Sequence, residues 1–323
     1  MAKENLSGAD KIEVFHRPNP YDLFRISATF DDREVAPPPR TYILAEDPER
    51  ELEQVVDSLQ ESFEQGLLFV GLTGSRVIRP VNPGSDLDVI AIVTDDAQGD
   101  GLEFEGDLKI VSKSGLRAFI ECGYQLITTQ FRKAQPLYEI GGALDEERSL
   151  VPIPGVAIPF LRTKSKFNEQ TADILKLTSD KHRAIFFHQI GLTDESYTQL
   201  QGIEHDDLFR SYQEEFSKID SEVYGMLAMH YANLGLNRMF HSLSEMAQAL
   251  HILENGNVAD VEELIEWTED NITSSGSLFR RIHEKRRACY KQGELLLDTE
   301  YDAIREGIRV ENRVLEEILI AKL

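Results

Sequence analysis

The apolar pattern of this 323-residue chain changes its period near residue 150. Before that point, short apolar runs bounded by Gly and Pro alternate with segments of helical spacing, which predicts strands and helices together. After it, nearly every segment repeats apolar residues at i, i+3 and i+4, which predicts helices alone. We therefore expect an α+β fold, with a small mixed β-sheet and flanking helices followed by an all-α helical bundle.

The Pro-rich run at 151–160 is typical of a linker between these two parts. We predict an N-terminal extension at 1–45 that packs on the first domain, a first domain at 46–150 and a helical domain at 151–323. A strand near 21–30 is expected inside the extension. At ~100–200 residues per domain, the length of the chain accommodates this division.

In the first domain the pattern predicts two helices and four strands. The first helix spans 47–65, with Asp47 as its cap and Pro48 in its first turn. The other expected elements are strands at 67–72, 86–93, 102–112 and 137–140 and a helix at 114–131. In the second domain we expect helices near 167–190, 205–234, 238–254, 258–270, 277–296 and 298–321.

Composition limits the partners of the chain. Its 34 Lys and Arg against 57 Asp and Glu give a net charge of −23, which repels a phosphate backbone and argues against broad nucleic-acid binding. Cys122 and Cys289 have no companion Cys or His at metal-ligand spacing, which fits a reducing cytoplasm. No apolar run approaches the ~20 residues that span a bilayer, so we expect a cytoplasmic protein without a membrane partner.

The stretch GLTGSRVIRPVNPGSDLDVIAIV at 71–93 carries the chemistry. Asp86 and Asp88 lie two apart on a strongly β-prone segment, so both carboxylates share one face of a strand, while Val89 and its alternate neighbours point into the core. Two adjacent carboxylates repel each other, and a divalent cation removes that repulsion. Hard oxygen ligands with few protein contacts suit Mg²⁺, whose other positions go to water and phosphate oxygens.

A phosphate-binding turn is expected just upstream of this pair. Gly74 follows a buried strand and allows the backbone to approach a ligand closely. The Ser75 hydroxyl and nearby amides can donate to a phosphate. A phosphate clamp, an Asp-x-Asp metal site and a scaffold strand together indicate metal-assisted phosphoryl chemistry.

The pattern Gly74-Ser75, ten residues and then Asp86-x-Asp88 resembles the signature of the polymerase-β-like nucleotidyltransferase superfamily. With Arg76 and Ser85, it is most similar to the small prokaryotic branch, which includes minimal nucleotidyltransferases and aminoglycoside adenylyltransferases. The resemblance covers roughly residues 50–145, under a third of the chain. Arg79 departs from it, since the small members usually carry glycine there, and the path of the loop is left open.

The resemblance implies a third carboxylate on a neighbouring strand. Asp107 is our choice for this carboxylate. Glu105 is the alternative, because it shares a face with Asp107 if the strand is regular. It further implies that Asp86, Asp88 and Asp107 hold two Mg²⁺ ions, with Asp107 also a candidate base. Gly74 and Ser75 would hold the β- and γ-phosphates, with Arg76 as a further nucleotide-binding candidate.

The activity that the resemblance implies is transfer of a nucleoside monophosphate, with ATP the favoured donor, to an acceptor hydroxyl with release of pyrophosphate. The net charge favours a cationic small molecule or a protein as acceptor. A non-catalytic, antitoxin-like regulatory member of the same fold is the alternative.

Relatives often use a lysine of the helical domain for the triphosphate, and five basic residues are candidates: Lys164, Lys166, Lys176, Lys181 and Arg183. Arg183 and His188 also match the Arg-x4-His spacing of HEPN-type RNases, a second alternative. That match rests on two residues, and we predict that it does not form an RNase site.

Overall fold

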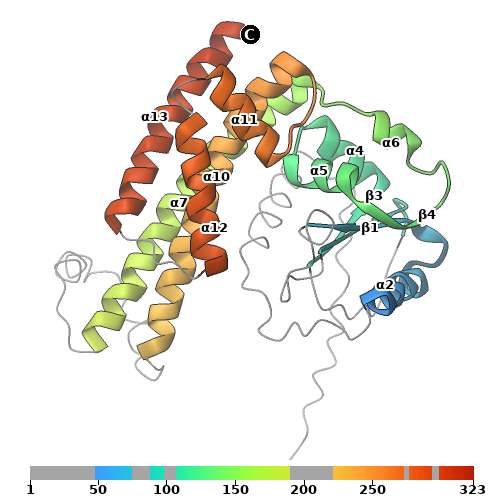
Figure 1. Cartoon of the computed structure of the whole chain (residues 1–323), viewed down its shortest axis with the longest axis horizontal. Coiled ribbons are helices and arrows are strands. Elements are labelled where there is room, and N and C mark those ends of the chain that lie inside the picture. Colours follow the sequence, from blue (N-terminus) through green and yellow to red (C-terminus); the bar gives the residue numbers. More distant parts are fainter. Residues whose placement is uncertain (1–47, 75–87, 98–106, 190–220, 273–275, 293–297) are drawn as a thin grey trace, which may run out of the picture. The chain divides into compact units, whose positions relative to one another are not determined.

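The computed structural model describes residues 48–74, 88–97, 107–189, 221–272, 276–292 and 298–323 (Figure 1). The predicted N-terminal extension and its strand near 21–30 lie outside these ranges. Helices predominate among the described residues, and four strands form one mixed sheet. This confirms the α+β class.

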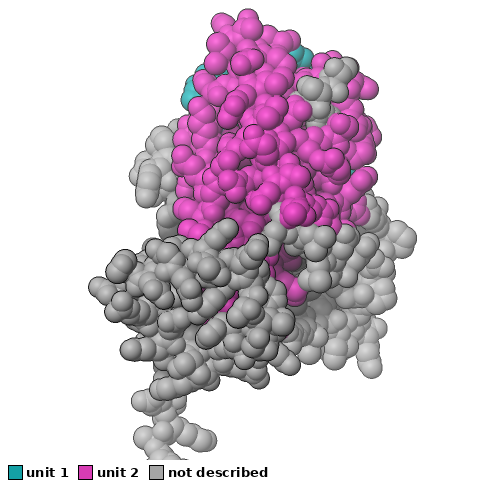
Figure 2. All heavy atoms as spheres, turned by 90° about the vertical axis from the view of Figure 1, so that its left-hand side faces the viewer, with its two compact units in different colours: residues 1–161, 248–263 teal, residues 162–247, 264–323 magenta. Residues whose placement is uncertain are grey.

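The chain divides into two compact units (Figure 2). The first comprises residues 1–161 and 248–263, and the second comprises residues 162–247 and 264–323. The division between 161 and 162 falls inside a helix. The proposed functional domains, 46–150 and 151–323, stay predictions.

Most of the described elements of the first unit lie between residues 48 and 149. They are helix α2 (Pro48–Phe63), the 3₁₀ turn η1 (Glu64–Gly66), strands β1 (Leu67–Thr73), β2 (Asp88–Val93) and β3 (Asp107–Ser112), helices α4 (Lys113–Glu121) and α5 (Gln125–Lys133), strand β4 (Gln135–Glu139) and helix α6 (Asp145–Ser149). The sheet has the order β3-β2-β1-β4. β1 is antiparallel to β2 and β4, whereas β2 and β3 are parallel.

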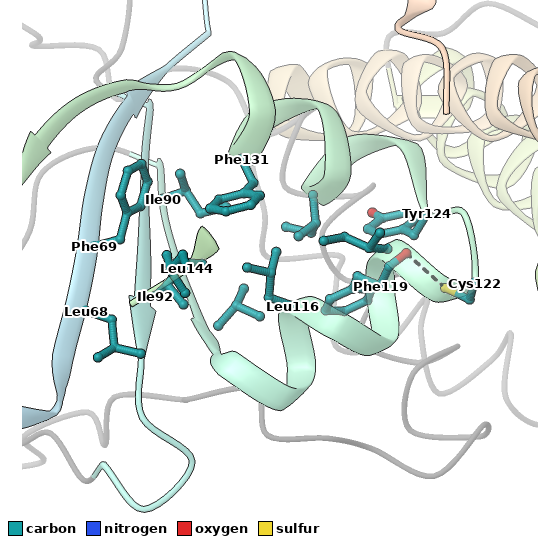
Figure 3. Packing of buried hydrophobic residues seen from close by; sticks show 13 residues of the cluster. Leu68, Phe69, Ile90, Ile92, Leu116, Phe119, Cys122, Tyr124, Phe131 and Leu144 are labelled. Carbon is teal, nitrogen blue, oxygen red and sulfur yellow. Dashed lines mark hydrogen bonds between the residues drawn. The ribbon is translucent and has the colours of Figure 1, made fainter. Parts of the chain in front are cut away.

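The sheet is covered on both faces, which explains why β1 is buried along its whole length. On one face, Phe69, Ile90 and Ile92 pack against apolar residues of α4 and α5 (Figure 3). On the other face, Val89 and its alternate neighbours pack against Leu59 of α2. The core therefore lies on both sides of β2, and Asp88 stands at one end of this buried strand.

Where one helix was expected at 114–131, the structure has two. α4 ends at Glu121, and Gly123 adopts a left-handed conformation with φ of +70°. The left-handed backbone of this turn favours glycine, and a Cβ on Gly123 would lie 2.5 Å from Ile252 Cδ1, so that a side chain here would also shift the end of Ile252. α5 begins two residues after Gly123. The apolar residues expected on one face of a single helix still pack in one core, because α4 and α5 both contribute to it.

The expected linker at 151–160 is wrong, because α7 begins at Pro154 and continues to Gln189. Proline suits the first position of a helix, and the Ile153 carbonyl accepts from the amides of Val156 and Ala157. Pro159 removes one hydrogen bond inside the helix. Burial of Ala157 and two further apolar side chains, Ile158 and Leu161, offsets that loss.

The second unit is built from helices: most of α7, most of α10 (Ser221–Asn255), the end of α11 (Val261–Asn271), α12 (Gly276–Gln292) and α13 (Asp298–Lys322). α10 is continuous through residues 235–237, where a break between two helices was expected. A Cβ on Gly235 would lie 2.3 Å from the Tyr301 hydroxyl, so this glycine allows α13 to approach α10 and does not interrupt the helix. The predicted break at 255–257 is confirmed, since α10 ends at Asn255 and Gly256 has φ of +73°.

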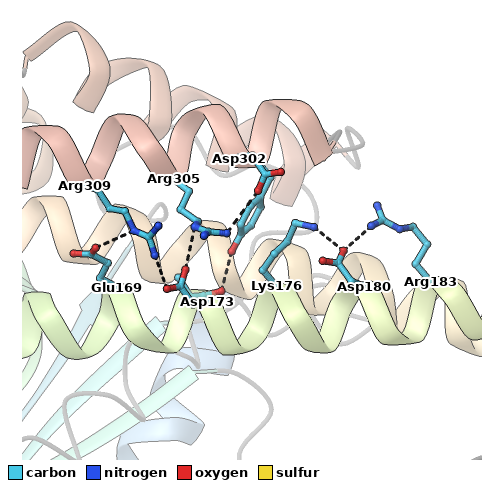
Figure 4. A network of polar contacts seen from close by, with 10 residues as sticks. Glu169, Asp173, Lys176, Asp180, Arg183, Asp302, Arg305 and Arg309 are labelled. Carbon is cyan, nitrogen blue, oxygen red and sulfur yellow. Dashed lines mark hydrogen bonds and ion pairs between the residues drawn. The ribbon is translucent and has the colours of Figure 1, made fainter. Parts of the chain in front are cut away.

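Polar contacts join the long helices of the second unit. Arg309 of α13 donates to Glu169 and Asp173 of α7, over 3.2 and 2.6 Å (Figure 4). The Tyr301 hydroxyl donates to the Ala172 carbonyl over 3.0 Å, and burial, with Asp173 second, raises its pKa. These contacts fix α13 along α7 within this unit.

Candidate functional site

Two of the three residues predicted to bind metal, Asp88 and Asp107, lie at one end of the sheet. The register pairs Thr73 with Asp88 across β1 and β2, and it pairs Asp88 with Asp107 across β2 and β3. Paired residues of neighbouring strands share a face of the sheet, so the backbone brings the positions of Asp88 and Asp107 side by side. The Thr73 hydroxyl donates to the Asp88 carbonyl over 3.3 Å and ties the ends of β1 and β2 together.

Gly74 begins the turn beside this row of residues. Its φ of +71° lies in the left-handed region, which glycine enters without strain. A Cβ built on Gly74 would lie 1.8 Å from Asp88 Oδ2 and 2.7 Å from Asp88 Cγ. The half-buried Asp88 carboxylate therefore packs directly against the backbone of Gly74, and any side chain at position 74 would have to displace it.

Three predicted site residues, Ser75, Arg76 and Asp86, lie outside the described residues, as does the alternative Glu105. The backbone of Asp107 is described, and it is the first residue of β3. Within the described part of the chain, no group of three or more His, Cys, Asp or Glu side chains is placed to hold a metal ion. The predicted three-carboxylate group is not tested by that result, because Asp86 is not among the residues searched.

The described residues fit a hard divalent cation. Asp88 supplies a partly exposed carboxylate at the end of a rigid, buried strand, and the register places a second acidic residue beside it. Two carboxylates at paired positions repel each other unless a cation lies between them. Gly74 itself adds no side chain next to the Asp88 carboxylate.

The N-terminus of α4, which also follows a strand of the sheet, is already occupied by the protein itself. The Ser112 side chain accepts from the Gly115 amide over 3.2 Å, and Asp95 Oδ1 accepts from the Ser114 amide over 2.8 Å. A helix N-terminus satisfied by a carboxylate does not attract a phosphate. The Gly74 turn is therefore the better phosphate-binding candidate of the two.

Most of the predicted triphosphate-binding cations already have acidic partners. Lys164 lies 2.5 Å from Glu245, Lys176 lies 2.6 Å from Asp180, and Arg183 lies 2.5 Å from the same Asp180 oxygen. The more exposed Lys166 lies 3.1 Å from Glu316, whereas Lys181 is half-buried. The Arg183 pair favours a structural role for the Arg-x4-His motif, and the side chain of His188 is outside the described residues.

A basic helix was missed in the sequence analysis. α12 carries six Lys and Arg and a single acidic residue, in a chain of net charge −23. Counting charges helix by helix would have found it. The structure gives several of these cations structural partners: Arg280 binds Glu269, Lys285 binds Glu300, and Arg286 lies 4.1 Å from the Phe240 ring centroid.

No known protein family matches the chain, and no curated protein matches it in sequence. Among the helices of the described ranges, none combines the length and the apolar character needed to cross a membrane. The functional argument therefore rests on the residues and on their arrangement.

Proposed function

We propose that the chain is a metal-dependent nucleotidyltransferase that moves a nucleoside monophosphate, with AMP favoured, from an NTP to an acceptor hydroxyl and releases pyrophosphate. The observation that supports this most is the row Thr73–Asp88–Asp107 at the sheet end, with the Gly74 turn packed on the Asp88 carboxylate. It joins a candidate metal ligand to a candidate phosphate-binding turn.

In this proposal, Asp86, Asp88 and Asp107 would hold Mg²⁺, which would stabilise charge on the entering and leaving oxygens when bound. The Gly74 turn would hold the β- and γ-phosphates with Ser75, and Arg76 would add a positive charge there. Asp107 would also take the proton of the acceptor hydroxyl. The net charge of −23 favours a cationic small molecule or a protein hydroxyl as acceptor over a polynucleotide.

The test is to incubate the full-length protein with each α-labelled NTP, Mg²⁺ and cell lysate, and then to identify the labelled product. We expect transfer of label with one NTP, and loss of transfer in Asp88→Asn. Asp96→Asn is the matched control, because Asp96 is an exposed carboxylate in the turn after β2 and should leave activity unchanged.

Two results would count against the proposal. Transfer that persists in the Asp86→Asn, Asp88→Asn double variant would remove these residues from the site. Binding of Mg²⁺ and a non-hydrolysable NTP, together with no transfer from any α-labelled NTP to any acceptor, would favour the regulatory, antitoxin-like alternative.

Asp107 and Glu105 can be separated by the rate of pyrophosphate release at saturating NTP and acceptor. Asp107 is paired with Asp88, so Asp107→Asn should lower the rate by about 10²–10⁴. Glu105→Gln should have little effect. A large loss in Glu105→Gln alone would move the third carboxylate to that position.

A further inference from the structure

Thr73 is a buried polar residue at the end of an otherwise apolar strand. It is the last residue of β1, whose other residues are all apolar or glycine, and only 4% of its surface is exposed. Its hydroxyl donates to the carbonyl of Asp88 over 3.3 Å, and the register pairs the same two residues. Valine would fill nearly the same space and suits a strand equally well, so packing alone does not require a hydroxyl here. The bond to Asp88 is what the hydroxyl adds at this position.

Asp88 is contacted at two points by consecutive residues. The Thr73 hydroxyl binds its main chain, and the backbone of Gly74 packs on its side chain, since a Cβ built on Gly74 would lie 1.8 Å from Asp88 Oδ2. The first contact restrains the backbone of Asp88, and the second restrains its half-buried carboxylate. A functional side chain has to be held within about 0.5 Å of its working position, and the two restraints act together toward that precision.

We propose that Thr73 is a positioning residue of the proposed metal site. Its hydroxyl holds the main chain of Asp88, so that the Asp88 carboxylate is in place before a divalent cation binds. This inference rests on the proposed function, because Thr73 acts through Asp88 and does not itself bind the metal. Loss of the hydroxyl should therefore weaken metal binding and leave the chemistry of the loaded site largely intact.

Thr73→Val tests this, because it removes the hydroxyl and keeps the shape of the side chain. Two metal titrations are measured on the full-length protein: the Mn²⁺ concentration that gives half of the full rise in the midpoint of thermal unfolding, and the Mg²⁺ concentration that gives half-maximal label transfer. Both should rise about three- to tenfold, which is the effect that one hydrogen bond can have. At saturating Mg²⁺ the transfer rate should return to within about twofold of the wild type. Unchanged metal requirements would overturn the inference.

Thr268→Val is the matched control for a purely structural loss. Thr268 is fully buried in the second unit, and its hydroxyl donates to the Leu264 carbonyl over 2.6 Å. Each of the two valine variants loses one hydroxyl-to-carbonyl bond, so both may be compared for unfolding without metal. Only Thr73→Val should change the metal requirement. An equal change in Thr268→Val would assign the effect to general destabilisation and overturn the role of Thr73.

Serine and alanine at position 73 give a second comparison, which decides the matter if Thr73→Val does not fold. The two variants differ only in the hydroxyl. Thr73→Ser keeps the donor and should need about as much metal as the wild type, whereas Thr73→Ala should need several times more. Equal metal requirements of these two variants would overturn the inference.

The wild type separates this inference from the proposed function. A wild type that shows neither a Mn²⁺-dependent rise in the unfolding midpoint nor label transfer would remove the metal site, and the role of Thr73 with it. A wild type that responds to metal, with the same metal requirement in Thr73→Val, would keep the metal site and overturn the role of Thr73 alone.

Discussion

The contact between Gly74 and Asp88 is the smallest feature on which the candidate site depends. A backbone in the left-handed region and a carboxylate oxygen within 1.8 Å of a built Cβ are two separate demands on one residue. The first is a matter of conformational strain, and the second is a matter of space. Substitutions can separate them because the chain has other left-handed glycines with free space around them.

Gly74→Ala should therefore cost more than strain alone. The left-handed conformation costs alanine about 1–2 kcal/mol, and the methyl group must in addition displace the Asp88 carboxylate. We expect loss of nucleotidyl transfer and of Mg²⁺-dependent stabilisation, measured by label transfer and by thermal unfolding. Gly256→Ala is the control, since Gly256 has φ of +73° and nothing lies within 4 Å of its built Cβ. Equal effects of the two changes would show that space at position 74 is unimportant.

How far the sequence predicts the site also depends on single residues. The alternation around Asp86 and Asp88 predicted a strand with Val89 and its alternate neighbours in the core. Val89 and Ala91 are indeed core residues. The pairing of Asp88 with Asp107 depends on which strands are adjacent and in which register, and a local pattern does not contain that information. The burial of Lys109 on β3 was missed for the same reason, since a lone lysine in a strand looks like a surface residue until both faces are known to be covered.

At the scale of elements, buried charges hold α7 and α10 together in the second unit. Lys164 is fully buried and lies 2.5 Å from Glu245, whose other oxygen accepts from Asn168 over 2.9 Å. Arg238 in turn donates to Asn168 over 2.8 Å. Every link joins the two helices, so the network fixes their relative register within this unit.

Lys164→Met should destabilise the protein by about 3–5 kcal/mol, because it leaves the Glu245 charge buried without its cation. Lys166→Met on the same helix is the matched control. Lys166 is 59% exposed and binds Glu316, so its loss should cost at most about 1 kcal/mol. Urea unfolding of the two variants measures the difference, and similar losses would mean that the buried pair contributes little.

Glu316 gives α13 a pH-dependent contact with α7. Hydrogen bonds from Arg162, and secondly from Lys166, hold the pKa of this carboxyl below its usual range. A lowered folded-state pKa gives stability that is present above the unfolded value of about 4.3 and is lost as the pH falls through the folded value. Glu316→Gln should therefore flatten the fall in unfolding midpoint between about pH 5 and 3. Glu317→Gln, at an exposed neighbour, serves as the control, and an unchanged slope in Glu316→Gln would contradict the assignment.

The elements that sequence patterns predicted poorly share a cause. Gly123 divides the expected helix at 114–131, whereas Gly235 leaves α10 intact. Both glycines lie against side chains distant in the sequence, Ile252 and Tyr301, and only one of them is left-handed. Local propensity cannot tell these cases apart, because tertiary contacts decide them. The Pro-rich start of α7 was misread for a related reason, since its apolar residues are core residues.

At the scale of the whole molecule, charge is the dominant property. A net charge of −23 favours states in which the acidic groups lie far apart, and this opposes folding. The ion pairs within each unit act in the opposite direction. The balance between the net repulsion of the acidic groups and the attraction within the ion pairs decides whether salt stabilises or destabilises the protein.

We expect added salt to stabilise the protein. Raising KCl from about 0.02 to 0.5 M shortens the screening length to a few ångströms, which weakens long-range repulsion more than it weakens buried pairs such as Lys164–Glu245. The unfolding midpoint should rise, and it should rise further still in a variant with an added exposed acidic residue. A fall in the midpoint would show that exposed ion pairs outweigh the net repulsion.

The packing of Asp88 on Gly74 also couples the evolution of these two positions. While position 88 carries a carboxylate, a side chain at position 74 is disfavoured by the left-handed backbone and by the Asp88 carboxylate that it would displace, so sequence change at 74 is easier after change at 88. A lineage that had lost the acid would be free to replace the glycine, and its turn would then be open to ordinary residues. The two positions are expected to be retained together or lost together, and a glycine kept at 74 would mark a chain whose acid at 88 is still under selection.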